Sequence, residues 1–256
     1  MNPAEFVALA RVEREHWFYR GKRDVVHHWA RTLLHLSPED LVVDVGAGTG
    51  QLVIEFSGTC KAVGIEPHPV ALHIAAGKPI PLVQGSVTAL PLAAGRAALV
   101  TAMDVLEHLE DDASALAELL RITRPGGFIF IGVPAFQILW SDWDESLGHK
   151  RRYTKRALLQ LVNRFDVTVR RCVYVNTAAF LPVLCYRWLR TRIGGQRRLE
   201  DGVPTALVNH VLYKLFVVPA CWSWLSPPFG ISIFCILQKT PPIGADPGAA
   251  QPELSS

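Results

Sequence analysis

The segment VVDVGAGTGQL (42–52) holds residues whose types and spacing suit the binding of a charged, nucleotide-like ligand. Gly46, Gly48 and Gly50 alternate along it, and a backbone without Cβ atoms lets a ligand approach closely. Dinucleotide cofactors bind at G-x-G-x-x-G turns, and this chain has Gln51 where the third glycine of that pattern would stand. The departure counts against a nicotinamide cofactor, and therefore against an oxidoreductase.

Two carboxylates accompany these glycines. Asp44 stands just before them, where a carboxylate would repel a pyrophosphate but would attract a ligand that carries ammonium and sulfonium groups. Glu66 ends the segment KAVGIE (61–66), and its two oxygens can accept hydrogen bonds from both hydroxyls of a ribose. Together the acids and the glycines predict a nucleoside ligand with positive charge.

The elements that must position these residues are short apolar strands that alternate with helices. We expect strands at 41–45, 61–66, 81–86, 97–105, 128–134, 166–175 and 231–239. Near-continuous apolar strands separated by helices are typical of a mostly parallel sheet covered on both faces. The predicted fold is therefore α/β, Rossmann-like and doubly wound, with seven strands and a hydrophobic helical insert before the last one.

Helical spacing of apolar residues predicts a helix-like segment at 5–36. A second helix, 112–127, should stop at Pro125-Gly126-Gly127, and a third, 154–165, should begin with Thr154 as its N-cap. We expect the aromatic, acidic segment AFQILWSDWDES after Pro134 to be a loop.

At this point the chain resembles the class I S-adenosylmethionine-dependent methyltransferases. The glycine segment, QGSVTALPL (84–92), DVLEHLEDD (104–112) and LLRITRPGGFIFIGVP (119–134) carry the resemblance, which covers roughly residues 41–134. The resemblance implies S-adenosylmethionine as the cofactor. It assigns the methionine portion to Asp44, Gly46, Ala47, Gly48 and Gly50, the ribose to Glu66, the adenine flanks to Ser86 and Val87, and the methyl-transfer centre to Asp104. Many relatives have Asp in place of Ser86, which puts the adenine amino contact there in question.

Methyl transfer from a sulfonium is an in-line displacement, so the protein mainly supplies orientation, desolvation and a path for one proton. A hydroxyl acceptor also needs a base. We favour His149, because it follows the fifth strand on the side where open α/β sheets bind ligands. His108 and Tyr153 are the alternative catalytic candidates, although the EHL pattern around His108 recurs in the family and is also consistent with a structural turn.

The basic segment GHKRRYT (148–154) follows the acidic segment AFQILWSDWDES. A subset of the family has a similar GHxRRYT stretch. Arginine donates in two parallel prongs that match phosphate and carboxylate, so Arg151 and Arg152 are predicted to bind an anionic acceptor. The alternative is a brace, in which both pair with nearby acids at 142–145. The N-terminal helix-like segment contains HWF at 16–18. In relatives with a similar HWF-like segment, this N-terminal helix covers the cofactor cleft, so we also assign His16 and Trp17 to the substrate. The alternative is that the aromatic side chains simply pack on the sheet.

Composition limits the remaining classes. The net charge of +3 is small, and no NPPY-like tetrad follows the fourth strand, so nucleic-acid methylation is not expected. The five cysteines form no CxxC pair, which predicts reduced thiols in a cytoplasmic protein and no zinc site; we expect no metal. A catalytically silent cofactor-binding or scaffold protein is the rival to a methyltransferase.

A hydrophobic insert, 176–230, lies between the last two predicted strands, and arginine and tryptophan residues flank its apolar runs. Prolines interrupt it, so we expect contact with the inner face of a membrane and no span; the alternative is a buried cap or dimer face. The acceptor is then a small molecule or a lipid-linked compound with an anionic head and an apolar tail. The predicted divisions are a helical lid (1–40), a cofactor-binding core (41–175), the insert (176–230), the last strand (231–239) and a disordered tail (240–256).

Overall fold

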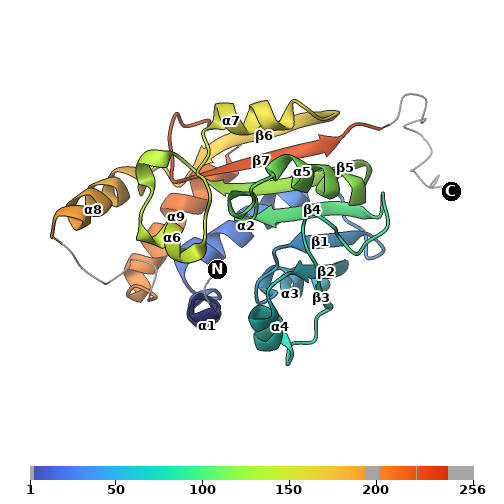
Figure 1. Ribbon diagram of the computed structural model, residues 1–256, viewed down its shortest axis with the longest axis horizontal. Helices are drawn as coiled ribbons and strands as arrows, with labels where there is room; N and C mark the ends of the chain where they lie inside the picture. Colours follow the sequence, from blue (N-terminus) through green and yellow to red (C-terminus); the bar gives the residue numbers. More distant parts are fainter. Residues whose placement is uncertain (1–2, 194–201, 223, 242–256) are drawn as a thin grey trace, which may run out of the picture.

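The computed structural model describes residues 3–193, 202–222 and 224–241, and these form a seven-stranded sheet with helices on both faces (Figure 1). The strand order is β3-β2-β1-β4-β5-β7-β6. Strands β3 to β5 are parallel, and β7 is antiparallel to both of its neighbours, β5 and β6. The strands are β1 (Leu41–Val45), β2 (Lys61–Glu66), β3 (Leu82–Gln84), β4 (Ala97–Met103), β5 (Thr123–Pro134), β6 (Val167–Val175) and β7 (Ser232–Lys239). The predicted fold class is confirmed.

The helices divide between the two faces of the sheet. Leu116 of α5 and Leu158 of α7 belong to one buried cluster, whereas Val26 of α2, Leu52 of α3 and Phe216 of α9 belong to the other. The helices are α1 (Pro3–Val12), α2 (Trp17–Leu33), α3 (Gln51–Ser57), α4 (Pro69–Ala75), α5 (Asp112–Ile122), α6 (Asp142–Leu147), α7 (Lys155–Val162), α8 (Phe180–Ile193) and α9 (Ala206–Cys221), with short 3-10 turns η1 (Leu106–His108) and η2 (Gln137–Leu139).

Burial explains why the central strands read as continuous apolar runs. Every residue of β4 except Met103 is buried, because helices cover both of its faces. Since β1 pairs with β2 on one side and β4 on the other, the strand order reverses beside β1. Open α/β sheets bind ligands at this reversal, outside the carboxyl ends of the strands. The glycine segment that follows β1 lies there.

Three local predictions differ from the structure. The helix-like segment 5–36 is two helices, because the chain turns at 13–16 and the His16 ring accepts a hydrogen bond from the Phe18 N–H at the start of α2. Helix α5 ends at Ile122, and β5 already begins at Thr123, since the residue before Pro125 disfavours helical backbone. The segment after Pro134 is no simple loop.

That last segment contains η2 and α6. Ser141 and Asp144 form a reciprocal capping box at the start of α6, in which each side chain bonds to the backbone of the other. The usual sequence pattern of a capping box has Glu or Gln three residues after the N-cap. Here Asp144 occupies that position, so the pattern was not recognised in the sequence. Helix α7 with Thr154 as its N-cap is confirmed: the Thr154 hydroxyl accepts a hydrogen bond from the Ala157 N–H.

The predicted insert corresponds to α8 and α9, apart from residues 194–201 and 223, which lie outside the described residues, as does most of the predicted tail. Helix α9 packs on α2 so closely that a Cβ at Gly21 would lie 2.6 Å from a ring carbon of Phe216. Helix α8 extends at one end of the molecule (Figure 1). Among the described helices, none has both the length and the apolar character that crossing a membrane requires.

Candidate active site

A cavity of about 720 Å³ opens at the carboxyl ends of the parallel strands. Its walls come from the ends of β1, β2 and β4 and from α1, α2, η1, α6, α8 and α9. The predicted site residues that line it are His16, Trp17, Gly46, Gly48, Glu66, Val87, Asp104, His108, His149 and Arg152. The remaining predicted residues, which are Asp44, Ala47, Gly50, Ser86, Arg151 and Tyr153, lie behind or beside this lining.

The glycine loop bends through left-handed backbone, with φ of +73° at Gly46, +55° at Gly48 and +82° at Gly50. A Cβ at Gly48 would meet no atom within 4 Å, so this backbone is open toward the cavity. At Gly46 a Cβ would lie 2.5 Å from a methyl group of Val105, and at Gly50 it would lie 2.3 Å from Ile80. Gly46 and Gly50 therefore allow Val105 and Ile80 to pack closely against the loop, whereas the backbone at Gly48 leaves room for a ligand.

Glu66 joins this loop to the end of β2. One of its carboxylate oxygens accepts a hydrogen bond from the Gly48 N–H at 2.8 Å, and the other accepts one from the His68 N–H at 2.9 Å. The side chain is buried, and this burial raises the pKa of Glu66 against the effect of the two backbone hydrogen bonds. Each oxygen keeps a further lone pair for a hydroxyl donor.

Asp44 lies beneath the loop and does not reach the cavity lining. Its carboxylate accepts a hydrogen bond of 2.6 Å from the Thr101 hydroxyl on β4. Burial raises the pKa of Asp44 to about 7, outweighing the hydrogen bond from Thr101. The charge of this carboxylate therefore varies near neutral pH, and its assignment to the methionine portion of the cofactor stays a prediction.

The predicted adenine flank is split between the surface and the cavity. Val87 is buried and lines the cavity, whereas Ser86 is exposed and its hydroxyl lies 2.8 Å from that of Thr88. The Ser86 side chain is therefore engaged with its own turn.

The sequence analysis missed Lys22. This buried lysine of α2 makes an ion pair with Asp104 and lies 4.1 Å from the centre of the Phe18 ring. Asp104 itself has a φ of +55°, which is uncommon for a residue other than glycine. The sequence did carry a signal for the contact between Lys22 and Phe18, because residues four positions apart on a helix share one face.

The N-terminal segment also touches the glycine loop. The Thr49 hydroxyl donates a hydrogen bond to the buried carboxylate of Glu13, and Lys78 lies 3.5 Å from the same carboxylate. His16 is buried at the start of α2, and burial lowers its pKa to about 4. The segment thus covers the cavity from above the loop, while its role as a lid stays a prediction.

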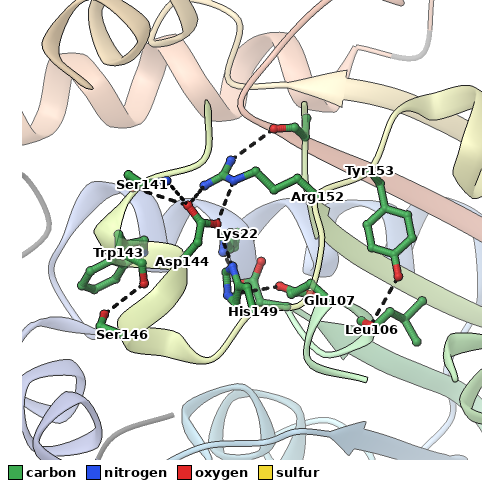
Figure 2. A network of polar contacts seen from close by, with 12 residues as sticks. Lys22, Leu106, Glu107, Ser141, Trp143, Asp144, Ser146, His149, Arg152 and Tyr153 are labelled. Carbon is green, nitrogen blue, oxygen red and sulfur yellow. Dashed lines mark hydrogen bonds and ion pairs between the residues drawn. The ribbon is translucent and has the colours of Figure 1, made fainter. Parts of the chain in front are cut away.

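Asp144 organises the basic segment 148–154 (Figure 2). Arg152 donates to both oxygens of Asp144, at 2.7 and 3.0 Å, and the Nδ1 atom of His149 lies 2.8 Å from one of them. Burial of this carboxylate opposes its ionisation, but the hydrogen bonds from His149 and Arg152 prevail and lower the pKa of Asp144 to about 2. Gly148 ends α6 in left-handed backbone, which turns His149 back toward Asp144.

Arg151 and Tyr153 are directed away from the cavity toward α5. Arg151 lies 3.3 Å from Asp112 and donates to the backbone carbonyls of Leu109 and Glu110. The buried Tyr153 hydroxyl donates to Asp112 at 2.8 Å, and burial and Asp112 raise the pKa of Tyr153. Both arginines thus form ion pairs with acids, as the alternative interpretation of the sequence expected. Arg152 pairs with Asp144, which lies in the predicted range, but Arg151 pairs with Asp112, which does not. The assignment of both arginines to an acceptor and of Tyr153 to catalysis stays a prediction.

Glu107, which is buried, and the half-buried His108 and His149 form a cluster at the cavity wall. The Nε2 atom of His149 lies 3.9 Å from a Glu107 oxygen (Figure 2), and the His108 and His149 ring centres are 4.8 Å apart. Within the described part of the chain, neither His149 Nε2 nor either Glu107 oxygen has a hydrogen-bond partner. Burial lowers the pKa of His108 to about 4 with help from His149, and burial raises the pKa of Glu107 well above its usual range.

The order of the seven strands and the glycine loop after β1 are features of a Rossmann-like fold of the S-adenosylmethionine-dependent methyltransferase type. An S-adenosylmethionine-dependent methyltransferase from Thermotoga maritima is similar with a TM-score of 0.58 and 18% identity, covering 93% of this chain and 96% of that one. A geranyl diphosphate methyltransferase solved with GPP and sinefungin has a TM-score of 0.57 at 13% identity, covering 85% of this chain and 77% of that one. At these identities the likeness concerns the fold.

The sequence comparisons are more specific for the core. Residues 43–131 match the family described as a methyltransferase domain. The demethylmenaquinone methyltransferase of Mycolicibacterium vanbaalenii is 36% identical over 104 residues, which are 40% of this chain and 45% of that protein. An uncharacterized methyltransferase of Mycobacterium ulcerans is 37% identical over 113 residues, 42% of this chain and 44% of that protein. The chain thus spans less than half the length of these relatives, and the matches support a methyltransferase core without specifying an acceptor.

Proposed function

We propose that the protein transfers a methyl group from S-adenosylmethionine to a small-molecule or lipid-linked acceptor with an anionic head. The observation that carries the proposal is the glycine loop at 46–50, tied by Glu66 to the edge of the cavity, within the segment that matches a methyltransferase domain.

The residues present fit this cofactor. The open backbone at Gly48 leaves room for the methionine portion, and Glu66 keeps lone pairs for both ribose hydroxyls. Asp44 supplies negative charge beneath the loop for a cationic ligand. The cofactor, when bound, supplies a methyl group on a positively charged sulfur. The chain then has to orient the acceptor, exclude water and receive a proton where the acceptor gives one up.

The two histidines at the cavity wall are the groups that we place beside the reacting atom of the acceptor. The carboxylate of Asp144 accepts the Nδ1–H of His149, so the neutral His149 ring presents the Nε2 lone pair. His149 and His108 both line the cavity. A lone pair in that position can accept a proton from a hydroxyl acceptor.

Charge and polarity of the walls support an acceptor with two different ends. Lys22, Arg152 and Arg187 line the cavity, where Lys22 pairs with Asp104 and both arginines contact Asp144; an anionic head would share these cations with the two carboxylates. Apolar side chains line the cavity as well, among them Val183 of α8 and Leu212 of α9. The names of a demethylmenaquinone methyltransferase and a geranyl diphosphate methyltransferase among the similar proteins are consistent with such an acceptor.

The outer side of α9 supports contact with a membrane surface. We define the α9 stripe as the exposed apolar residues of α9 and of the C-cap that follows it, which recur at helical spacing: Leu207, Val208, Val211, Leu215, Val218 and the C-cap Trp222. Val208 and Leu215 also line the cavity, so the stripe is continuous with the apolar wall. A protein that takes a lipid-linked acceptor from a leaflet needs an apolar surface of this kind beside its cavity.

Calorimetry and product analysis test the proposal in sequence. The purified chain should bind S-adenosylmethionine and its demethylated product, and it should bind NADH much more weakly. Incubation with methyl-labelled S-adenosylmethionine and a cell extract should then place label in the organic phase. Binding of NADH in preference to S-adenosylmethionine would refute the cofactor, whereas label confined to the aqueous phase would refute only the lipid-linked acceptor.

A further inference from the structure

Glu107 is a buried carboxylate that the proposed function does not use. Its side chain is fully buried in η1, and neither oxygen has a hydrogen-bond partner among the described residues. The nearby cations are engaged elsewhere, since Lys22 pairs with Asp104 and Arg152 pairs with Asp144. Buried carboxylates in proteins are protonated, paired or bound to a metal ion.

His149 faces this carboxylate with its second ring nitrogen. Nδ1 contacts Asp144 at 2.8 Å, and Nε2, which has no hydrogen-bond partner among the described residues, lies 3.9 Å from a Glu107 oxygen. A direct hydrogen bond would need a separation of roughly 2.7–3.2 Å. A carboxylate oxygen and an imidazole nitrogen that face each other across such a gap, with no direct hydrogen bond, leave space for a metal ion between them.

His108 completes a set of three donors. The ligand atoms of Glu107, His108 and His149 all lie within 4.8 Å of one another. Bonds to zinc from imidazole nitrogen and carboxylate oxygen are about 2.0–2.2 Å long, so small inward movements of the side chains would bring all three donors into contact with one ion. We propose that these three residues bind a divalent transition-metal ion at the wall of the cavity.

The surroundings of His149 match those of a metal ligand. Histidines that bind metals usually donate their other ring N–H to a carboxylate, which fixes the ring and raises its basicity. Asp144 occupies this position, and Arg152 holds Asp144 in turn through both of its oxygens (Figure 2). The backbone adds a further restraint, because the Lys150 N–H donates to the Glu107 carbonyl at 2.7 Å and keeps the two segments together.

Two imidazoles and one carboxylate suit zinc, iron(II), cobalt and manganese, and such sites with open positions bind substrates. His108 and His149 line the cavity, whereas Glu107 lies behind them, so the open positions of an ion would face the cavity. An oxygen of the acceptor would bind there. That consequence rests on the proposed function, but the binding of the ion does not.

The test uses the untagged full chain after treatment with a chelator. Titration with Co²⁺ should reach one equivalent and give visible absorption of a site with nitrogen and oxygen ligands, and Zn²⁺ should displace it. X-ray absorption of the wild-type Co²⁺ form should report two imidazole ligands, a result that needs no variant. Absence of stoichiometric binding, or a site without imidazole, would overturn the proposal and leave His149 as a simple base.

Variants then assign the ligands. Glu107→Gln and His149→Asn should each weaken Co²⁺ binding at least tenfold, and Asp144→Asn should weaken it by about 10- to 100-fold through His149. His73→Asn, on the exposed side of α4, is the matched control and should bind as the wild type does. Calorimetry with S-adenosylmethionine in metal-free buffer separates the two proposals, because cofactor binding should persist without the ion. Equal Co²⁺ affinity in folded Glu107→Gln and wild type would exclude Glu107.

Discussion

The cofactor side and the acceptor side of the cavity are built in different ways. On the proposed cofactor side the decisive contact runs from the Gly48 N–H, in the loop after β1, to Glu66 at the end of β2, only 18 positions further along the chain. On the acceptor side, Lys22 meets Asp104 across 82 positions, and the Trp17 N–H donates to the Asn209 side chain across 192. The proposed cofactor site is therefore formed by a local loop, whereas the proposed acceptor wall depends on the assembly of distant helices.

The two sides also differ in charge. The proposed cofactor side has two buried acids: Glu66 lines the cavity, and Asp44 lies behind the glycine loop. The acceptor side gathers Arg152, Arg187 and His149 around a single buried carboxylate, Asp144. This division would let the protein attract a cation and an anion into one cavity and hold them next to each other.

The largest expected effect is on the cofactor side. Glu66→Gln replaces an acceptor of two backbone N–H groups and, as proposed, of two ribose hydroxyls. Hydrogen bonds to charged groups contribute about 1.5–3 kcal/mol each, so the affinity for S-adenosylmethionine in calorimetry should fall about 100-fold. Glu39→Gln, an exposed glutamate paired with Lys61, should leave the affinity unchanged. Equal affinities of the two variants would remove Glu66 from the cofactor site.

The second effect tests the long-range assembly of the acceptor side. Lys22→Met leaves Asp104 without its buried partner, and because Asp104 is partly exposed the free energy of unfolding should fall by about 1–3 kcal/mol in urea titrations. The double variant Lys22→Met/Asp104→Asn should recover part of this loss. Lys61→Met, which breaks an exposed pair, should cost less than about 0.5 kcal/mol. A Lys22→Met variant as stable as Lys61→Met would show that the pair does not hold α2 in place.

The third effect is a dependence of cofactor affinity on pH. In the folded protein the pKa of Asp44 is raised to about 7, so below pH 7 the carboxyl is mostly protonated and must lose a proton before it can attract a cation. The affinity for S-adenosylmethionine should therefore rise by up to about tenfold per pH unit as pH increases toward 7, and then level off. Asp44→Asn should bind more weakly and with a flatter profile between pH 6 and 7. A flat wild-type profile would contradict this role.

The smallest effect concerns the α9 stripe. Leu207→Asp/Val211→Asp places two charges in the stripe outside the cavity lining, and partition of the protein onto anionic vesicles should fall several-fold in sedimentation. Ala157→Asp/Gln160→Asp on the exposed face of α7 matches the added charge and should change partition less. Both variants should retain cofactor binding. Equal partition of the two double variants would argue against membrane contact through this helix.

The cofactor half was readable from sequence because its signals are local. The strands at 41–45 and 61–66, and the glycines between them, are patterns of neighbouring residues, and they formed as predicted. The capping box of α6 was missed because Asp stands where Glu or Gln is usual. The partners of Arg151 and Arg152 were predicted only in part, because Asp112 lies on a different helix whose packing no local pattern reports.

The sequence by itself determined the order of the seven strands along the chain and the glycine loop after the first of them, since both follow from apolar periodicity and from the freedom of glycine backbone. Only the tertiary structure decided that Lys22 meets Asp104, that Asp144 gathers His149 and Arg152, and that Glu107 faces His149 with no hydrogen-bond partner in the described part of the chain. The physical reason is burial. Desolvation makes an isolated charge costly wherever it lies, but which charges are brought together away from water depends on how helices distant in the chain pack on the sheet.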